Sequence, residues 1–243
     1  MLVSSRVIVL NSFKYKDDSF ITHVLTEKEG YASFLVRISR SPRATVRHTL
    51  FQPLALLQLE WEEKKSLELI RPKSAQVAVP FISLPFHPVK ATMALFLSEF
   101  LSHALRSEPM SPALFEYVYR SVEWLDTAQK DFANFHLVFL MRLSRFLGFF
   151  PDLTLAGKQD YFDMEKCSFT PHRPVHPYYL EPVDAARLPV LLRMRYENMR
   201  FFRFSGVERN RFLHHLNIFY RLHLPNFPEL RSLSVLREVF EVS

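Results

Sequence analysis

The sequence carries four arginines within a short stretch that contains no acidic residue. They are Arg37, Arg40, Arg43 and Arg47, and residues 37–48 include neither Asp nor Glu. Guanidinium groups bind phosphate oxygens, and the Ser and Thr hydroxyls between these arginines can donate hydrogen bonds to the same oxygens. The spacing therefore predicts a segment that binds a polyanion, and nucleic acid is the first candidate for this ligand. An ordinary solvated charge run is the alternative interpretation.

Lysines and tyrosines near this segment could complete such a site. Lys14, Tyr15 and Lys16 lie upstream, and Tyr31 begins the run that leads to Arg37. Aromatic rings stack on the bases of single strands while cations follow the backbone. We expect the lysines to contact phosphates and the tyrosines to stack on bases, with packing on the outside of a sheet as the alternative for the tyrosines.

The residues on either side of the arginines have the alternation of β-strands. In residues 31–38, Ala32, Phe34, Val36 and Ile38 share one face, which is strand periodicity. Four guanidiniums cannot be buried without partners, so the basic segment must be a solvated loop between strands. The strands that we expect cover residues 3–10, 20–26, 31–38, 54–61 and 67–77.

Five strands in about eighty residues with one long basic loop suit an OB-fold barrel over residues 1–80. Gly30 stands where a hairpin requires a positive φ, so the second and third strands should pair directly. The charged segment 13–18 is expected to be the loop before the second strand. Another small five-stranded barrel, such as an SH3-like one, shows the same periodicity and stays open.

The pattern changes near Pro80, and residues 81–243 are expected to form an all-α domain. Apolar residues recur at three and four positions, which predicts helices over residues 89–105, 111–127 and 131–149, the third of them central. Ser111 is a candidate cap for the second helix. Residues 151–182, with five prolines, are expected to be an irregular insertion. Two further helices should follow, one ending near residue 223 and one at the end of the chain.

Composition limits the class of protein. The 243 residues are 48% hydrophobic, and no apolar run approaches the length that crosses a bilayer. The N-terminus lacks the pattern of a signal peptide, and a single cysteine, Cys167, suits a reducing compartment. These features predict a soluble, cytoplasmic protein.

The net charge of +6 is unevenly distributed. Residues 1–48 carry eight Lys and Arg against four Asp and Glu, and residues 182–224 carry eight against three. The second region offers a possible secondary basic surface, for which a solvated helical face is the alternative. Its candidates are Arg193, Arg195, Arg200, Arg203, Arg209 and Arg211.

Residues that could support enzymatic chemistry do not form a recognisable set. Cys167, His172 and His176 have metal-ligand character, but structural zinc needs a second pair of ligands, so we expect no metal. The four glycines form no phosphate-binding loop and no dinucleotide fingerprint. The sequence therefore predicts a binding protein without a cofactor.

Three segments resemble the RecO family of bacterial recombination mediators and DNA repair proteins. The first is the barrel, with Lys16 to Ser19, the hairpin LTEKEGYASFLVR (residues 25–37) and the run from Phe51 into residues 56–60. The second is FLGFFPDL (residues 146–153), and the third is FYRLHLPNFPELRSLSVL (residues 219–236). They follow the order of the family and span nearly the whole chain.

This resemblance implies an OB-fold followed by a helical domain. It also implies a protein that binds single- and double-stranded DNA, anneals complementary strands, and works with RecR and single-strand-binding protein (SSB) to load RecA. The SSB tail, acidic and hydrophobic, would need an apolar groove with cations, and Arg142 and Arg145 fit that description. Many relatives carry a four-cysteine zinc finger in the segment corresponding to 151–182. Only Cys167 is present here, so packing of Tyr161, Phe162 and Phe169 is expected to replace the metal.

The function that we expect is a non-enzymatic DNA-binding recombination mediator associated with the nucleoid. The alternative is a protein-interaction adaptor whose basic barrel binds acidic peptide and contacts DNA only nonspecifically.

Overall fold

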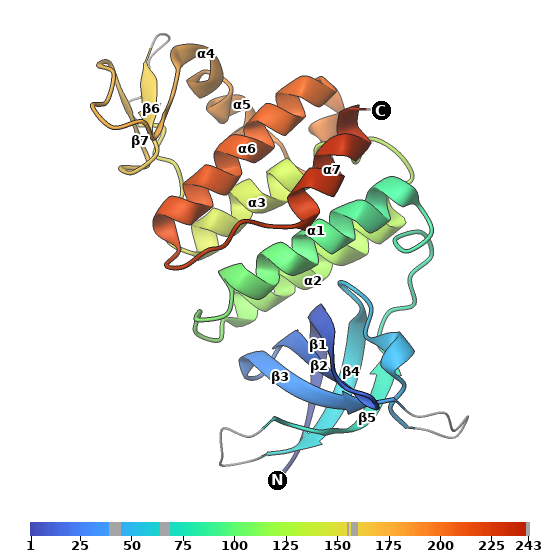
Figure 1. Cartoon of the computed structure of the whole chain (residues 1–243). Helices are drawn as coiled ribbons and strands as arrows, with labels where there is room; N and C mark the ends of the chain where they lie inside the picture. Colours follow the sequence, from blue (N-terminus) through green and yellow to red (C-terminus); the bar gives the residue numbers. More distant parts are fainter. Residues whose placement is uncertain (39–44, 64–68, 155, 157–159, 242–243) are drawn as a thin grey trace. The chain divides into compact units, whose positions relative to one another are not determined.

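The structure is a computed structural model that describes residues 1–38, 45–63, 69–154, 156 and 160–241 (Figure 1). The chain divides into two compact units. One comprises Met1–Thr127 and Leu230–Leu236, and the other Ala128–Glu229 and Arg237–Ser243. The predicted domain boundary after residue 80 stays a prediction, because these units reflect packing and not independent folding.

The first unit begins with an antiparallel sheet of five strands, as the sequence predicts. Its strand order is β3-β2-β1-β4-β5. The strands are β1 (Leu2–Lys16), β2 (Ser19–Thr26), β3 (Gly30–Arg37), β4 (Leu56–Glu62) and β5 (Pro72–Val77). A 3-10 helix, η1 (His48–Leu50), precedes β4.

The core of this sheet consists of the residues that alternate inward along the strands. Val7, Val24, Phe34 and Trp61 are almost completely buried, and the rings of Phe34 and Trp61 meet edge to face at 5.2 Å. An isolated parallel bridge joins Phe34 of β3 to Ile70, just before β5, so the two edge strands of the sheet meet. This arrangement is compatible with an OB-fold barrel.

Strand β1 is longer than the sequence indicates. The segment 13–18, expected as a loop, is strand up to Lys16, because β1 and β2 stay paired as far as Lys16 and Ser19. Only Asp17 and Asp18 form the turn. Mixed aromatic and charged residues at an exposed strand end hide the alternation that would have revealed the strand.

The hairpin between β2 and β3 turns at Gly30, as expected. Its φ of 75° lies in the left-handed region, where glycine has no steric penalty. A Cβ at this position would also meet Met110 at 3.3 Å, so the turn lies close against the segment before α2. This turn pairs Tyr31 with Leu25 and Ser33 with His23.

Two helices follow the sheet in the first unit. They are α1 (Pro88–Ala104) and α2 (Pro112–Thr127). Ser111 acts as the predicted cap, since its hydroxyl accepts a hydrogen bond from the Leu114 N–H at 3.3 Å. The Asp126 carboxylate accepts the N–H groups of Ile82, Ser83 and Leu84, and thereby fixes the chain that leads into α1.

The second unit is mainly helical. Its α-helices are α3 (Phe135–Phe146), α4 (Pro182–Ala185), α5 (Leu188–Arg193) and α6 (Gly206–His223), with a 3-10 helix η2 (Met199–Phe201). Helix α3 is shorter than the predicted 131–149, because Asp131 and Gly148 have positive φ values of 62° and 85° that end a right-handed helix. The last helix, α7 (Ser232–Glu241), contributes residues to both units.

The proline-rich segment 151–182 contains a small sheet. Strands β6 (Tyr161–Asp163), β7 (Ser168–Thr170) and β8 (Tyr179–Leu180) pair antiparallel in the order β7-β6-β8. Within the described ranges, no helix has the length and apolar character needed to cross a membrane.

Candidate nucleic-acid interface

The ends of β1 and β3 bring four of the predicted site residues together. In the sheet register, Lys16 pairs with Ser19 and Ser19 pairs with Arg37, so the three residues are aligned across neighbouring strands. Lys14, Tyr15, Lys16 and Arg37 are all exposed. We call these four residues the basic end of the sheet.

Tyr15 occupies an irregularity in β1. The register shifts between Lys14 and Lys16, which leaves Tyr15 without a regular partner in β2. Its ring is 50% exposed, and the Lys16 ammonium lies 5.4 Å from the ring centroid. The Tyr15 ring and the Lys16 ammonium are therefore both exposed and adjacent, so one ligand could contact both. The exposed Asp17 and Asp18 in the turn partly offset the positive charge.

The arginine segment leaves the sheet at this same end. Arg37 is the last residue of β3, and Arg40 and Arg43 lie outside the described residues. Arg47 is exposed and precedes η1. The next residue, His48, stacks on Phe20 at 5.7 Å with the ring planes 5° apart. Since Phe20 follows Ser19, the described end of the segment also returns near the basic end.

Tyr31 lies elsewhere on the sheet. It is the second residue of β3, six positions from Arg37, which is about 20 Å along a strand. Its ring is half-buried and stacks on His23 at 5.4 Å, and burial raises the pKa of its phenol to about 12. The structure therefore separates Tyr31 from Tyr15, the other tyrosine that the sequence suggested as a candidate for stacking on bases.

The candidate secondary basic surface contains two kinds of arginine. Arg193, Arg195, Arg200 and Arg203 are exposed, and the Arg200 guanidinium lies 4.7 Å from the ring centroid of the exposed Phe201. Arg211 forms an ion pair with Asp184 at 2.9 Å. Arg209 is half-buried and donates to the Phe204 carbonyl at 2.5 Å. Arg211 is also exposed, but Asp184 already engages it, so Arg193, Arg195, Arg200 and Arg203 are the four that we take as open to a ligand.

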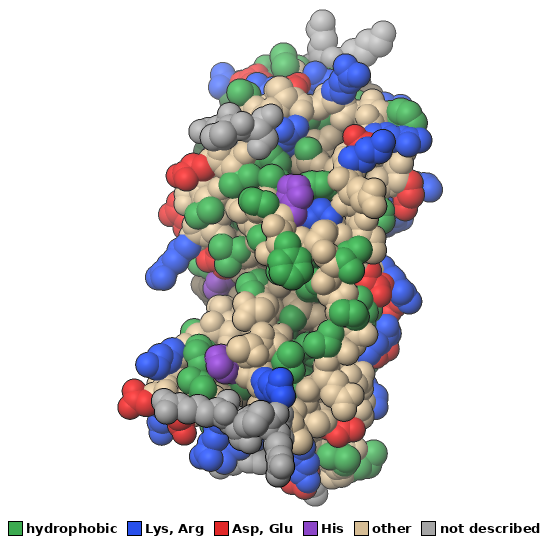
Figure 2. Space-filling view, turned by 90° about the vertical axis from the view of Figure 1, so that its right-hand side faces the viewer, with side chains coloured by type: hydrophobic (Ala, Val, Ile, Leu, Met, Phe, Trp, Pro, Cys, Tyr) green, Lys and Arg blue, Asp and Glu red, His purple; other side chains and the backbone are tan. Residues whose placement is uncertain are grey.

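The basic and acidic side chains of the described surface are interspersed on the face in Figure 2, with hydrophobic side chains between them. A polyanion would therefore meet local groups of cations on that face and not one uniform positive field.

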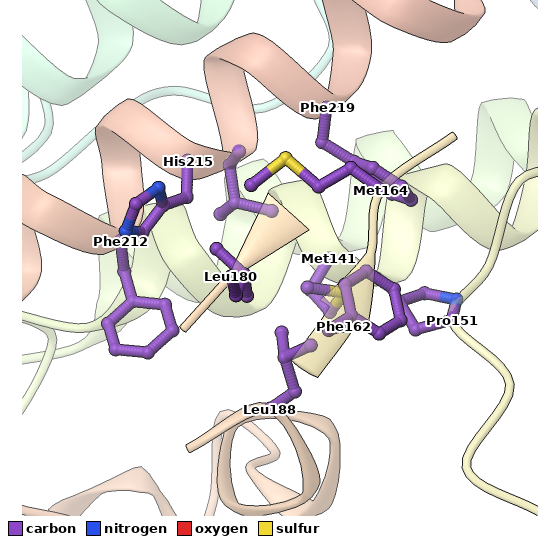
Figure 3. A pocket seen from close by; sticks show the side chains of 10 residues that line it. Met141, Pro151, Phe162, Met164, Leu180, Leu188, Phe212, His215 and Phe219 are labelled. Carbon is purple, nitrogen blue, oxygen red and sulfur yellow. The ribbon is translucent and has the colours of Figure 1, made fainter. Parts of the chain in front are cut away.

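The two arginines of α3 differ in their surroundings. Arg142 is half-buried and donates to the Met194 carbonyl at 3.0 Å, whereas Arg145 is exposed and lies over the Phe150 ring at 5.4 Å. Next to Arg142 in the chain, Met141 lines a small apolar cavity of about 20 Å³ (Figure 3).

This cavity lies where the proline-rich segment packs on the helices. Figure 3 shows Phe162, Met164 and Leu180 of that segment pointing toward Met141 of α3 and Phe219 of α6. Phe162 and Phe169 also meet edge to face at 5.3 Å, and both are buried. Apolar packing thus holds the segment in place.

The residues present do not fit the zinc finger that the family resemblance suggests for the segment 151–182. The Cys167 Sγ lies 3.4 Å from the His223 Nε2, while His176 contacts Asp163 at 3.3 Å. Burial raises the pKa of the Cys167 thiol to about 11, whereas zinc binds the thiolate. In the part of the chain that the structure describes, no three His, Cys, Asp or Glu side chains are placed to hold a metal ion.

A larger apolar groove lies within the first unit. It has a volume of about 450 Å³, and its lining comes from η1, β4, β5 and α1 and from the chain between β5 and α1. Leu50, Leu57, Phe81 and Leu84 are among its apolar lining residues. Thr49 also lines the groove, and so the exposed Arg47 lies two residues from it in the chain.

Comparison with known proteins assigns the family. Residues 1–80 match the family model described as Recombination protein O N terminal, and residues 86–233 match Recombination protein O C terminal. A protein named DNA repair protein RecO from Bacteroides fragilis (strain YCH46) is 50% identical over 242 residues, covering 99% of this chain and all of that protein. Proteins of the same name from Phocaeicola vulgatus and Porphyromonas gingivalis (strain W83) are 45% and 33% identical with the same coverage. The resemblance seen in the sequence is thereby confirmed, and the chain belongs to the RecO family.

Proposed function

We propose that this protein is a non-enzymatic recombination mediator in DNA repair. It binds single- and double-stranded DNA, anneals complementary strands and, together with RecR, helps to load RecA onto strands coated with SSB. The observation that carries the proposal is the match to both RecO family models, together with full-length relatives named DNA repair protein RecO. A role on DNA places the protein at the nucleoid in the cytoplasm.

In this proposal the basic end provides the primary DNA contact. Lys14, Lys16 and Arg37 are exposed cations at one end of a sheet. Arg40 and Arg43 follow Arg37 in the chain, and the exposed Arg47 precedes His48, which stacks on Phe20. Each phosphate contact releases counterions, which favours binding without reading the sequence of the DNA. Annealing then requires no active-site chemistry, because neutralising two strands lowers their mutual repulsion.

A second DNA contact would come from the exposed arginines of the other unit. Arg193, Arg195, Arg200 and Arg203 could hold a second strand or receive an acidic partner. Phe201, 70% exposed beside Arg200, adds an aromatic ring of the kind on which bases stack.

The SSB tail is proposed to bind near α3. Arg145 is an exposed cation on this helix and can meet a carboxylate. Arg142 already donates to a backbone carbonyl, so we assign it to holding the local fold and only secondarily to the tail.

Strand annealing tests the proposal. Two complementary oligonucleotides that carry a donor and an acceptor dye should anneal faster with the protein than without it. Replacing Lys14, Lys16 and Arg37 together by Glu should reduce this acceleration at least tenfold, because three attractive phosphate contacts become repulsive.

A control with the same change in net charge is available. Lys28, Lys130 and Arg221 are exposed and lie outside the proposed contacts, so their replacement by Glu should leave most of the acceleration. Equal losses in the two triple variants would show that only net charge matters. No acceleration by the wild type would contradict the annealing function.

The groove supports a second candidate function, an adaptor whose barrel binds an acidic and apolar peptide. The groove supplies an apolar surface, and Arg47 near one side supplies a cation for the acidic residues. An adaptor of this kind would bind such a peptide and would show weak, sequence-independent DNA contact only.

A further inference from the structure

Three rings form a row across the outer face of β1, β2 and β3. The centroid of His23 lies 5.5 Å from that of Phe13 and 5.4 Å from that of Tyr31. The row therefore begins at Tyr31 on β3, crosses β2 at His23 and ends at Phe13 on β1. Phe13 is followed directly by Lys14, the first residue of the basic end.

The sheet register produces this row. His23 pairs directly with Asn11 on one side and with Ser33 on the other, so Phe13 and Tyr31 are its diagonal neighbours. The His23 Nδ1 lies 2.8 Å from the Ser33 Oγ, and this hydrogen bond fixes the orientation of the imidazole. The alternation of Ile21, His23 and Leu25 and the turn at Gly30 indicate the pairing of β2 with β3, but not the contact between Phe13 and His23.

Exposure increases along the row. Tyr31 and His23 are half-buried, whereas Phe13 is 43% exposed and Tyr15, two residues further along β1, is 50% exposed. Burial lowers the pKa of His23, and the nearby charges of Arg106 and His103 lower it further. These effects favour the neutral imidazole, which packs between the other two rings.

A cation stands beside the half-buried part of the row. Arg106 is exposed and follows α1, and its charge also acts on the Tyr31 phenol. The charge of Arg106 thus acts on the half-buried part of the row, and the basic end follows Phe13 along β1. Aromatic rings flanked by cations match the alternation of bases and phosphates in a nucleic acid strand.

We propose that the Phe13–His23–Tyr31 row is a base-stacking platform for single-stranded nucleic acid, with Phe13 as the residue that touches the base. His23 and Tyr31 are positioning residues, because His23 packs against Phe13 and Tyr31 packs against His23. Arg106 is a phosphate contact. This proposal rests on the proposed DNA binding and deepens it. It also changes the role expected for Tyr31, which supports the stack instead of receiving a base.

The ligand is a single strand because the faces of bases in a duplex are already occupied by their neighbours. A single strand can turn its bases onto aromatic side chains, and such stacking tolerates any base. The platform would therefore add binding free energy for single strands to a phosphate contact that single and double strands share.

The test compares two oligonucleotides of equal charge. One is an oligo(dT) of about twenty nucleotides, and the other is an abasic strand with the same number of phosphates. The wild type should bind oligo(dT) more tightly. Phe13→Ala should weaken oligo(dT) binding about fivefold or more and leave abasic binding unchanged.

Phe86 provides the matched control, since it is 76% exposed and lies outside the sheet. Phe86→Ala should bind both strands as the wild type does. Phe13→Trp keeps a stacking surface and should retain the preference for oligo(dT), which separates loss of the ring from loss of the fold.

The outcomes distinguish this proposal from the proposed function. Equal binding of both strands by the wild type would overturn the platform and leave DNA binding intact. A preference that persists in Phe13→Ala would also overturn the platform. Binding of neither strand would overturn the proposed function, and the platform with it.

Discussion

At the scale of single residues, the surroundings decide what each basic side chain can do. Lys14, Lys16 and Arg37 stay exposed at strand ends, whereas Arg209 donates to a backbone carbonyl and lies 5.0 Å from the Phe240 ring centroid. Desolvation lowers the pKa of Arg209, as expected for a cation held within the fold. Residue type alone therefore cannot separate a ligand contact from a structural contact.

His136 shows the same effect for a titratable group. It is completely buried in α3, its ring stacks on Phe240 at 4.8 Å, and neither ring nitrogen has a hydrogen-bond partner among the described residues. Burial, with a smaller contribution from the charge of Arg209, lowers the pKa of His136 to about 3. The ordinary value, which applies to the unfolded chain, is 6.5.

This difference predicts acid sensitivity. Below pH 6.5 His136 binds a proton in the unfolded chain but stays neutral in the folded protein. The free energy of unfolding therefore decreases as the pH falls from 6.5 toward 3. The loss is about 1.4 kcal/mol per pH unit. The free energy of unfolding, measured with urea, should therefore fall by about 2 kcal/mol less between pH 7 and pH 5 in His136→Phe than in the wild type.

The exposed His172 supplies the control for this prediction. His172→Phe should keep the pH dependence of the wild type. Identical pH dependence in His136→Phe and the wild type would show that the folded protein protonates His136 as readily as the unfolded chain does.

At the scale of elements, local signals in the sequence predict what local interactions determine. The alternation in β2 and β3, the turn at Gly30 and the cap at Ser111 all occur where the sequence places them. The end of β1 differs from the prediction. Lys14 to Lys16 are in a strand because they pair with β2, although their side chains do not indicate a strand. The ends of α3 also depend on positive φ values, at Asp131 for example, that periodicity cannot show.

Some features of the candidate site also follow from local signals in the sequence, whereas others depend on how the strands pair. Exposure of Lys14, Tyr15, Lys16 and Arg37 follows from their charge and from their places at strand ends. The contact between Phe13 and His23 requires the register of β1 on β2, including its irregularity after Val9, and no pattern in either strand alone contains that information.

Helix α6 begins with a capping box that can be tested. The Ser205 hydroxyl accepts the Glu208 N–H at 3.2 Å, and the Glu208 carboxylate accepts the Ser205 N–H at 2.9 Å. Ser205→Ala removes one half of this arrangement and should lower the free energy of unfolding by about 1 kcal/mol. Urea unfolding of the full chain measures the change.

Two further variants separate capping from a general effect of substitution at serine. Ser205→Asp keeps an acceptor at the cap and should restore most of the stability. Ser107→Ala changes an exposed serine outside any helix and should have almost no effect. Equal stability of Ser205→Ala and the wild type would contradict the role of the capping box.

At the scale of the whole molecule, the chain keeps the two-part organisation of the RecO family. Both family models match, and a five-stranded sheet is followed by helices. The single cysteine departs from the four-cysteine zinc finger that the resemblance implies for this segment, where aromatic and methionine side chains pack around Phe162. Apolar packing contributes to holding this small segment on the helices, whereas the absence of a metal stays a prediction.

The salt dependence of single-strand binding tests the central claim most directly, because it counts phosphate contacts. Fluorescence anisotropy of a labelled oligonucleotide should compare the wild type with a variant in which Arg40, Arg43 and Arg47 are all Ala. For single strands the slope of log K against log salt changes by about 0.7 per phosphate, so losing three contacts should flatten it by about 2 and weaken binding. An unchanged slope would contradict the assignment of the arginine segment and move the DNA contact to Arg193, Arg195, Arg200 and Arg203. Absence of binding by the wild type would contradict the DNA-binding account and favour the adaptor.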